Sequence, residues 1–211
     1  MFTGLIQDTS RVLSYEKDQA SDCWNLWVET SLSTVSWKIG DSIATNGVCL
    51  TVVALDGRKV LFQVGPETLK ATNFKDLKKG QGLHLESSLK MGDPLGGHWV
   101  SGHVDAPARV AKRIQGQEVL TLSFSVEGPD RDKVAPFLVP KGSVAVDGVS
   151  LTVNAVRDLG SSTEFDVTLI PHTLKLTRFS ELTESDTVNI EADLIAKHAA
   201  RYAEYWKGTR S

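Results

Sequence analysis

The sequence predicts an all-β protein of two tandem, homologous domains followed by a C-terminal α-helix. Three observations predict this class. The chain repeats itself, short runs of alternating apolar and polar residues dominate it, and helical periodicity is confined to its C-terminal end. Its 211 residues suffice for one large domain or for two of about 100 residues each. The repeat therefore decides between one domain and two.

The repeat consists of three pairs of segments in the same order in both halves. Residues 2–7 (FTGLIQ) align with residues 100–105 (VSGHVD), which is the weakest pair. Residues 46–52 (NGVCLTV) and 147–153 (DGVSLTV) are identical at five of seven positions. Residues 66–74 (PETLKATNF) and 171–179 (PHTLKLTRF) are identical at six of nine. Because the identities include residues outside turns, we interpret the pattern as a duplication, which gives one chain two similar sites.

The strands are predicted from alternation. Val48, Leu50 and Val52 alternate with Cys49 and Thr51, which places the apolar set on a core and the polar set on the opposite face. The second repeat alternates in the same way over residues 149–153. Further strands are predicted at residues 24–28, 42–45, 60–64, 119–124, 143–146 and 165–170. Many short strands of this kind indicate a sandwich or a barrel.

Turns and helices complete the prediction. Asn46-Gly47 and Asp147-Gly148 favour positive φ and predict two tight hairpins. Residues 67–74 and 172–179 follow prolines and predict short connecting helices. Residues 192–207 carry apolar side chains on one helical face, which either packs on its own barrel or joins neighbouring chains.

Composition excludes several classes of partner. The net charge of −3 provides no basic surface for nucleic acid, and no apolar run is long enough to span a membrane. The N-terminal residues lack the pattern of a secretory leader. The two cysteines, Cys23 and Cys49, are too few for a disulfide framework and fit a reducing compartment. We therefore expect no nucleic-acid or membrane partner and a cytoplasmic location.

The candidate chemistry is polar and carries no nucleotide or metal motif. No Walker A sequence, dinucleotide-binding glycine motif or thiolate pair is present, and we expect neither a metal nor a cofactor. His98 and His103 are five residues apart, and one of them is expected to serve in hydrogen bonding or acid–base chemistry. Cys49 and Thr51, like Ser150 and Thr152, form either an exposed strand surface or the floor of a site for a polar heterocycle.

The sequence resembles the riboflavin synthase family. The resemblance rests on residues 1–6 (MFTGLI), on the two repeated strands at 46–52 and 147–153, and on residues 96–105 (GGHWVSGHVD), and it extends over nearly the whole chain. Val48 departs from it, because some members carry a second cysteine at this position. The family implies two six-stranded Greek-key β-barrels, a lumazine-binding barrel at residues 1–97 and another at 98–191, with a trimerisation helix at 192–211.

The resemblance also implies an activity. Members are transferases that convert two molecules of 6,7-dimethyl-8-ribityllumazine into riboflavin and 5-amino-6-ribitylaminouracil by moving a four-carbon unit, the last step of riboflavin biosynthesis, without a cofactor. The implied assembly is a homotrimer whose active sites lie between barrels of neighbouring subunits, and lumazine synthase is a candidate partner. The competing interpretation is a fluorescent antenna protein that binds a lumazine or flavin and catalyses nothing.

Site residues follow from the resemblance position by position. The site of the first barrel is expected to use Gly4, Leu5, Ile6, Ser42, Cys49, Leu50, Thr51, Gln63, Val64, Gly65, Pro66, Glu67 and Thr68. The site of the second barrel is expected to use Gly102, His103, Val104, Lys141, Ser150, Leu151, Thr152, Ile170, Pro171, His172, Thr173, Leu174 and Lys175, with a carboxylate from Asp193. Our mechanistic hypothesis gives the leading roles to Ser150 and His103, supported by Thr152 and Asp193, with Cys49 assisting in the opposite site.

Overall fold

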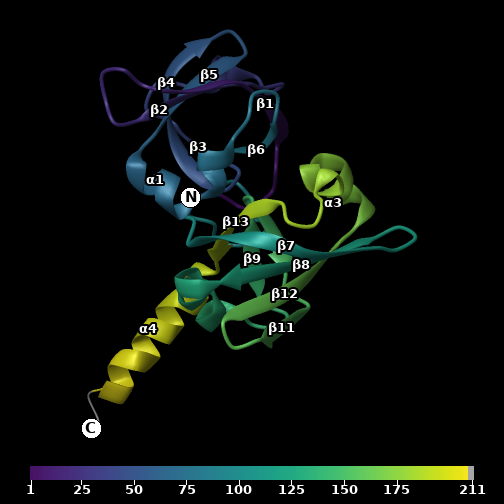
Figure 1. The fold of residues 1–211 in the computed structure, drawn as a ribbon. Helices are drawn as coiled ribbons and strands as arrows, with labels where there is room; N and C mark the ends of the chain where they lie inside the picture. Colours follow the sequence, from purple (N-terminus) through teal and green to yellow (C-terminus); the bar gives the residue numbers. More distant parts are fainter. Residues whose placement is uncertain (209–211) are drawn as a thin grey trace.

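The computed structural model describes residues 1–208 and contains two β-barrels in tandem with a helix projecting from the second (Figure 1). The first barrel is closed, in the strand order β1-β2-β5-β4-β3-β6. Its strands are β1 (Asp8–Lys17), β2 (Trp24–Glu29), β3 (Ser42–Thr45), β4 (Val48–Asp56), β5 (Lys59–Val64) and β6 (Gly82–Ser87). The predicted all-β class and duplication are confirmed.

The second barrel is a seven-stranded sheet in the order β10-β9-β13-β7-β8-β12-β11. Its strands are β7 (Ala106–Gln115), β8 (Leu120–Glu127), β9 (Ser143–Val146), β10 (Val149–Thr152), β11 (Ala155–Asp158), β12 (Ser162–Leu169) and β13 (Thr187–Ala192). The extra strand arises because the counterpart of β4 is interrupted. The two edge strands, β10 and β11, are joined directly through Val153 and Asn154, whose N–H groups donate to Gly142 and Asp166.

The hairpin turns match the prediction. In β3–β4, Thr45 pairs with Val48 across a two-residue turn in which Asn46 and Gly47 both have positive φ, 45° and 77°. Asp147 and Gly148 form the same turn in the second barrel, with φ of 44° and 80°. The alternation is confirmed too, since Val48, Leu50 and Val52 are buried in the core.

The predicted connecting helices each divide into two pieces. Residues 66–76 form α1 (Pro66–Ala71) and the 3₁₀ turn η2 (Asn73–Asp76), and residues 171–181 form α3 (Pro171–Leu176) and η5 (Arg178–Glu181). The division falls at Thr72 and Thr177, whose backbones are extended and whose hydroxyls bond carbonyls four residues back. The remaining short elements are η1 (Thr34–Ser36), η3 (Gly128–Asp130), α2 (Arg131–Val134) and η4 (Ala135–Phe137).

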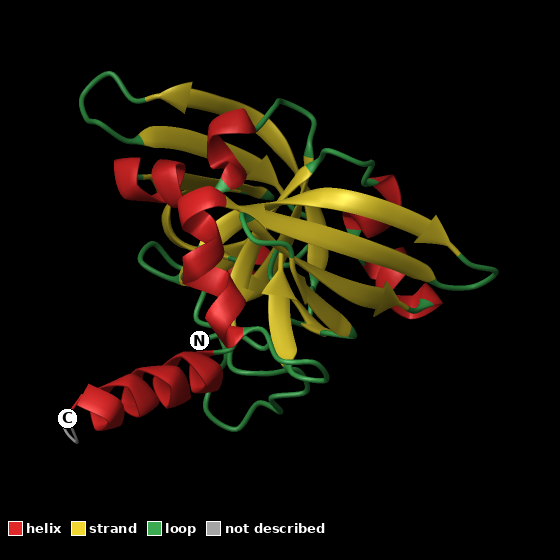
Figure 2. Ribbon diagram, turned by 60° about the horizontal axis from the view of Figure 1, so that its bottom comes forward, coloured by secondary structure: helices red, strands yellow, loops and turns green. Residues whose placement is uncertain are grey.

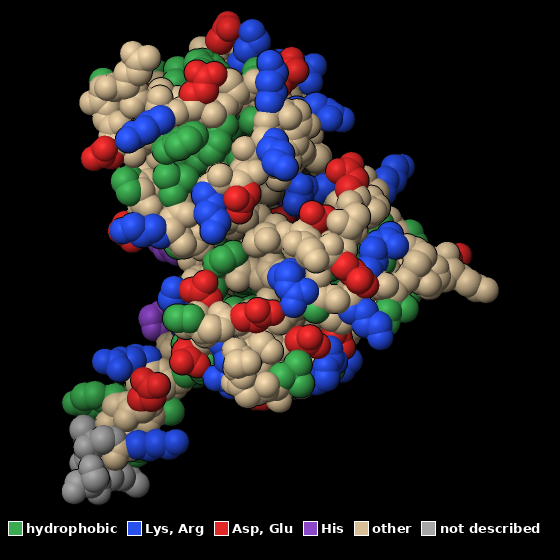
Figure 3. Space-filling view, in the orientation of Figure 1, with side chains coloured by type: hydrophobic (Ala, Val, Ile, Leu, Met, Phe, Trp, Pro, Cys, Tyr) green, Lys and Arg blue, Asp and Glu red, His purple; other side chains and the backbone are tan. Residues whose placement is uncertain are grey.

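The terminal helix α4 (Leu194–Gly208) projects away from both barrels (Figure 2). The predicted helix extends to residue 211, and residues 209–211 lie outside the described part of the chain. Ile195 and Tyr202 are 64% and 66% exposed, and Trp206, 47% exposed, stacks on Tyr202. The helix therefore presents much of its apolar surface to solvent instead of packing it on its own barrel, and hydrophobic side chains are visible on its surface in Figure 3. Within residues 1–208, no helix is long and apolar enough to cross a membrane.

The two barrels meet through a buried polar network with approximate twofold symmetry. Asn46 and Asp147 are equivalent turn residues, and each accepts a backbone N–H of its own barrel, from His84 and Asn189 respectively. His84 Nε2 accepts the N–H of Arg178, and His84 Nδ1 lies 3.0 Å from the carbonyl oxygen of Asp147. Because a carbonyl only accepts, Nδ1 carries the proton and the ring is neutral.

Burial determines how the charges of this network respond to pH. It lowers the pKa of His84 to about 4 and raises the pKa of Asp147 to about 6. The folded state thus binds fewer protons at His84 than the unfolded state between pH 4 and 6.5. The contribution of His84 to stability is complete above pH 6.5 and is lost as the pH falls. Asp147 acts with the opposite sign, since its contribution is present below pH 4 and is lost as the pH rises through 6.

We expect His84→Asn to remove the acid sensitivity that His84 causes. Asn189, the symmetry equivalent, uses its amide to accept from Asn73 and to donate to Asn46, so asparagine can make both bonds of His84. The free energy of unfolding of the parent should fall, relative to the variant, by up to about 1.4 kcal/mol per pH unit between pH 6.5 and 4. Urea unfolding at several pH values measures this difference. Parallel pH profiles of parent and variant would contradict the assignment.

Candidate functional site

The predicted polar residues lie on the outer faces of the two equivalent strands. Cys49 is half-buried and Thr51 is exposed on β4, and Ser150 is half-buried and Thr152 exposed on β10. Ser42 pairs with Thr51 across β3–β4, as Ser143 does with Thr152. Each barrel therefore presents a hydroxyl- or thiol-bearing face that is open to a ligand.

Two short segments cross from one barrel to the other, and this corrects the predicted grouping. The N–H of Ser150 donates to the carbonyl of Gly4 at 2.8 Å, and the N–H of Cys49 donates to the carbonyl of Gly102 at 2.8 Å. Ile6 packs against the core of the second barrel and Val104 against that of the first. Residues 4–6 therefore lie with Ser150, and residues 102–104 lie with Cys49, the reverse of the expectation.

The exchange has a steric basis. Gly4 and Gly102 have φ of 77° and 80°, and a Cβ on either would lie 2.6 Å from the Cβ of Ser150 or Cys49. Only glycine permits this approach at this backbone conformation. Phe2 and Val100, both fully buried, pair as a β-bridge between the two segments and fix where they cross.

His98, and not His103, is the histidine at Ser150. Nδ1 of His98 lies 2.7 Å from Oγ of Ser150, and the backbone N–H of His98 donates to the carbonyl of Thr3. His103, to which the sequence analysis gives a leading role, follows Gly102, whose carbonyl accepts the N–H of Cys49. His98 is the other histidine that the sequence offers for acid–base chemistry. The glycine pair before it is a signal of the close approach, since a Cβ on Gly97 would lie 3.0 Å from that of Ser150.

The environment of His98 suits proton transfer. Burial lowers the pKa of His98 below its ordinary value, although the Asp193 carboxylate opposes this shift. The ring is therefore neutral at pH 7, with one donor and one acceptor nitrogen. Nε2 is buried and has no hydrogen-bond partner among the described residues. If Nε2 carries the proton, Nδ1 accepts from the Ser150 hydroxyl, and if Nδ1 carries it, Nε2 becomes the acceptor. The hydrogen bond to Ser150 therefore depends on which nitrogen is protonated.

Asp193 and Lys141, both predicted for the site of the second barrel, differ in their local structure. Asp193 precedes α4 and its Oδ1 accepts the N–H of Ile195, which is also the geometry of a helix cap. Lys141 is exposed and donates its N–H to Val153, next to Thr152, at a φ of 69°. Gly40 makes the equivalent bond in the first barrel, to Val52. A lysine therefore occupies a strained conformation that the first repeat gives to glycine.

The remaining predicted residues divide between exposed and buried positions. The exposed or half-buried ones lie where two strands lead into helices. From the end of β5 into α1 they are Gln63, Gly65, Pro66, Glu67 and Thr68, and from the end of β12 into α3 they are Ile170, Pro171, His172, Thr173 and Lys175. Leu50 and Val64 are buried in the first core, so their side chains cannot reach a ligand on the outer face. Leu151 and Leu174 are partly buried and pack against the second core.

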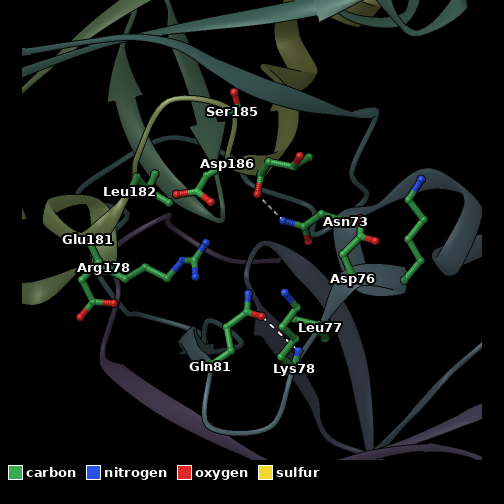
Figure 4. A pocket seen from close by; sticks show the side chains of 12 residues that line it. Asn73, Asp76, Leu77, Lys78, Gln81, Arg178, Glu181, Leu182, Ser185 and Asp186 are labelled. Carbon is green, nitrogen blue, oxygen red and sulfur yellow. Dashed lines mark hydrogen bonds between the residues drawn. The ribbon is translucent and has the colours of Figure 1, made fainter.

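A cavity of about 690 Å³ lies elsewhere, between the loops of residues 73–81 and 178–187 (Figure 4). It is lined largely by charged and amide side chains, including Asn73 and Arg178, and by none of the predicted site residues. We place the candidate sites at Cys49 and Ser150, because there the duplicated polar groups and the crossing segments converge.

Comparison with known proteins identifies the family. The family model described as lumazine binding domain matches twice, at residues 3–88 and 101–193. Riboflavin synthase of Brucella abortus (strain 2308) is 41% identical over 212 residues, covering 98% of this chain and 100% of that protein. The chain belongs to the riboflavin synthase family. The family's enzyme from Bacillus subtilis (strain 168) is 38% identical, covering 96% of this chain and 89% of that protein.

Solved structures with the same fold are more distant in sequence from this member of the riboflavin synthase family. LumP complexed with 6,7-dimethyl-8-(1'-D-ribityl) lumazine has a TM-score of 0.77 at 20% identity, covering 91% of this chain and 99% of that one. LumP complexed with riboflavin has a TM-score of 0.77 at 21% identity. These likenesses establish the double-barrel fold alone.

Proposed function

We propose that the chain is a riboflavin synthase that converts two molecules of 6,7-dimethyl-8-ribityllumazine into riboflavin and 5-amino-6-ribitylaminouracil. The reaction moves a four-carbon unit between two identical molecules, so all atoms of the two substrates are recovered in the two products. The observation that supports the proposal is a duplicated outer face with unequal polar groups, Cys49 beside the segment of Gly102 and His103 on one barrel and Ser150 bonded to His98 on the other. Similar faces can bind the same molecule, and their unequal polar groups can make one copy the donor and the other the acceptor of the four-carbon unit.

We propose the following roles for the residues of the two faces. Orientation of two rings on opposed faces replaces an unfavourable bimolecular encounter. The hydroxyl oxygen of Ser150 acts as the nucleophile at C7 of one lumazine, and the neutral ring of His98 accepts the proton of that hydroxyl group. The Asp193 carboxylate stabilises the positive charge that His98 then carries. His103 and Cys49 serve the opposite lumazine, from whose C7 methyl group a proton must be removed. Thr51 and Thr152 donate or accept hydrogen bonds at the ring edges.

The test needs only one substrate. The purified protein is mixed with 6,7-dimethyl-8-ribityllumazine, without metal or nucleotide, and riboflavin is followed by absorbance and chromatography. We expect one riboflavin for every two lumazines consumed. Tight binding without conversion would contradict the proposal and support the antenna. Against the antenna stands the 41% identity to a named riboflavin synthase over 98% of this chain, compared with 20% to LumP.

We also propose a cytoplasmic homotrimer joined through α4. The exposure of Ile195 and Tyr202 on a projecting helix supports an intermolecular contact, and the two unpaired cysteines fit a reducing compartment. Sedimentation at assay concentration should give three chains, and a stable monomer would contradict the trimer. Association with lumazine synthase is a further proposal, tested by cosedimentation of the two proteins.

Lys141→Gly should separate binding from folding. Glycine relieves the positive φ, so the free energy of unfolding should rise by about 1 kcal/mol. The lost ammonium group should weaken lumazine binding about tenfold, as expected for a hydrogen bond to a charged group. Urea unfolding and lumazine titration by fluorescence measure the two effects. An unchanged affinity would remove Lys141 from the site.

A further inference from the structure

Two buried glutamates hold the crossing segments in place. Glu86 on β6 and Glu191 on β13 are 2% and 3% exposed. The N-terminal ammonium group favours the charged form of Glu86, and Lys197 favours that of Glu191. Glu86 accepts the N–H and the hydroxyl of Thr3, both at 2.6 Å, and the N–H of Gly4 at 2.9 Å. A buried carboxylate is costly unless such bonds satisfy it, so three donors are gathered around each charge.

Glu191 repeats this arrangement in the second barrel. It accepts the N–H and the hydroxyl of Ser101, both at 2.7 Å, and the N–H of Gly102 at 2.9 Å. The two hydroxyls continue the chain of bonds, since Thr3 accepts the N–H of Leu5 and Ser101 that of His103. Each carboxylate therefore fixes the backbone of its crossing segment as far as the residue after the glycine, Leu5 or His103.

Each segment connects a glutamate of one barrel to the site of the other. The N–H of Gly4 is held by Glu86 of the first barrel, and its carbonyl accepts from Ser150 of the second. Gly102 links Glu191 of the second barrel to Cys49 of the first in the same way. A shift of either carboxylate is thereby transmitted across the barrel boundary.

We propose that Glu86 and Glu191 are positioning residues, each of which orients the segment that completes the lumazine site of the opposite barrel. The inference rests on the proposed function, because it assigns these two residues to the same pair of sites. It makes a specific claim. A change at Glu86 acts at the Ser150 site, and a change at Glu191 acts at the Cys49 site.

The test is a set of double-mutant cycles read by lumazine affinity. Glu86→Gln and Glu191→Gln are each combined with Gly4→Ala and with Gly102→Ala, and binding is titrated by fluorescence. Each glutamine substitution alone should weaken binding about tenfold at one site. Glu86→Gln with Gly4→Ala, and Glu191→Gln with Gly102→Ala, should weaken binding by less than the product of the single effects. In the two crossed pairs, Glu86→Gln with Gly102→Ala and Glu191→Gln with Gly4→Ala, the loss of affinity at each site should equal the product of the single effects.

The controls separate positioning from general destabilisation. Leu26→Ala shortens a core side chain of β2 and should show no coupling to either glycine variant. If the glutamine variants do not fold, Thr3→Val and Ser101→Ala, which remove the hydroxyl bond to each carboxylate and keep the backbone bonds, take their place. If the single effects on lumazine affinity multiply in all four double variants, the inference is overturned and the proposed function is unaffected. Absence of lumazine binding by the parent protein would overturn both.

Discussion

Ser150→Ala is expected to lower turnover about 100-fold or more while changing lumazine affinity by less than about tenfold. The hydroxyl lies 2.7 Å from Nδ1 of His98, so its removal takes away the group through which the neutral ring acts on the substrate. Binding loses one hydrogen bond at most, because the backbone N–H of residue 150 still donates to Gly4. Steady-state rates and fluorescence titration of the same preparation measure both quantities.

Ser125→Ala is the matched control for this substitution. Ser125 is a buried serine of β8 in the same barrel, and its hydroxyl bonds Glu127 away from the site. It should retain parental turnover. A Ser150→Ala rate within twofold of the parent would remove Ser150 from the mechanism and leave His98 without its assigned proton donor.

Gly102→Ala is expected to weaken lumazine binding at the Cys49 site by about 100-fold. The new methyl group would lie 2.6 Å from Cβ of Cys49 and 2.9 Å from its nitrogen, so the segment must leave the strand. The displacement breaks the backbone bond to Cys49 and moves His103 from the site. Gly4→Ala should act in the same way on the Ser150 site, where the corresponding distances are 2.6 and 2.7 Å. Fluorescence titration with lumazine measures both losses.

Gly160→Ala and Gly80→Ala separate backbone strain from this contact. Both glycines have φ near that of Gly102, 80° and 82°, and an added Cβ meets nothing within 4 Å. They should cost stability through positive φ, about 1 kcal/mol each, and leave lumazine affinity unchanged. Equal losses of affinity in all four variants would show that strain, and not the crossing contact, determines binding.

Much of the fold could be predicted because its signals are local. Asn46-Gly47 and Asp147-Gly148 encode their turns in two residues each, and the alternation after them assigns the core face without reference to the rest of the chain. The prolines at the first positions of α1 and α3 are equally local signals. The interruption between β10 and β11 was not predicted, because residues 149–153 alternate as regularly as 48–52 do.

The grouping of the site could not be predicted because it depends on contacts between barrels. The repeat alignment assigns Gly4 to its own half, whereas the structure assigns it to the half in which Ser150 lies. Similarly, the resemblance assigns His103 to the site of the second barrel, whereas the structure places His98 at Ser150. Which histidine reaches Ser150 is decided by the path of the chain between the barrels, which a pattern within either repeat does not contain.

The exchange of segments also bears on how the protein is made. Residues 4–6, which contact the strand of Ser150, are synthesised long before that strand. The strand of Cys49 is likewise synthesised before residues 101–104, and these before Glu191, which holds them. Such contacts have high sequence separation and form late in folding. Neither candidate site is complete until both barrels are synthesised, so under the proposed function a nascent chain with one barrel should not yet bind lumazine.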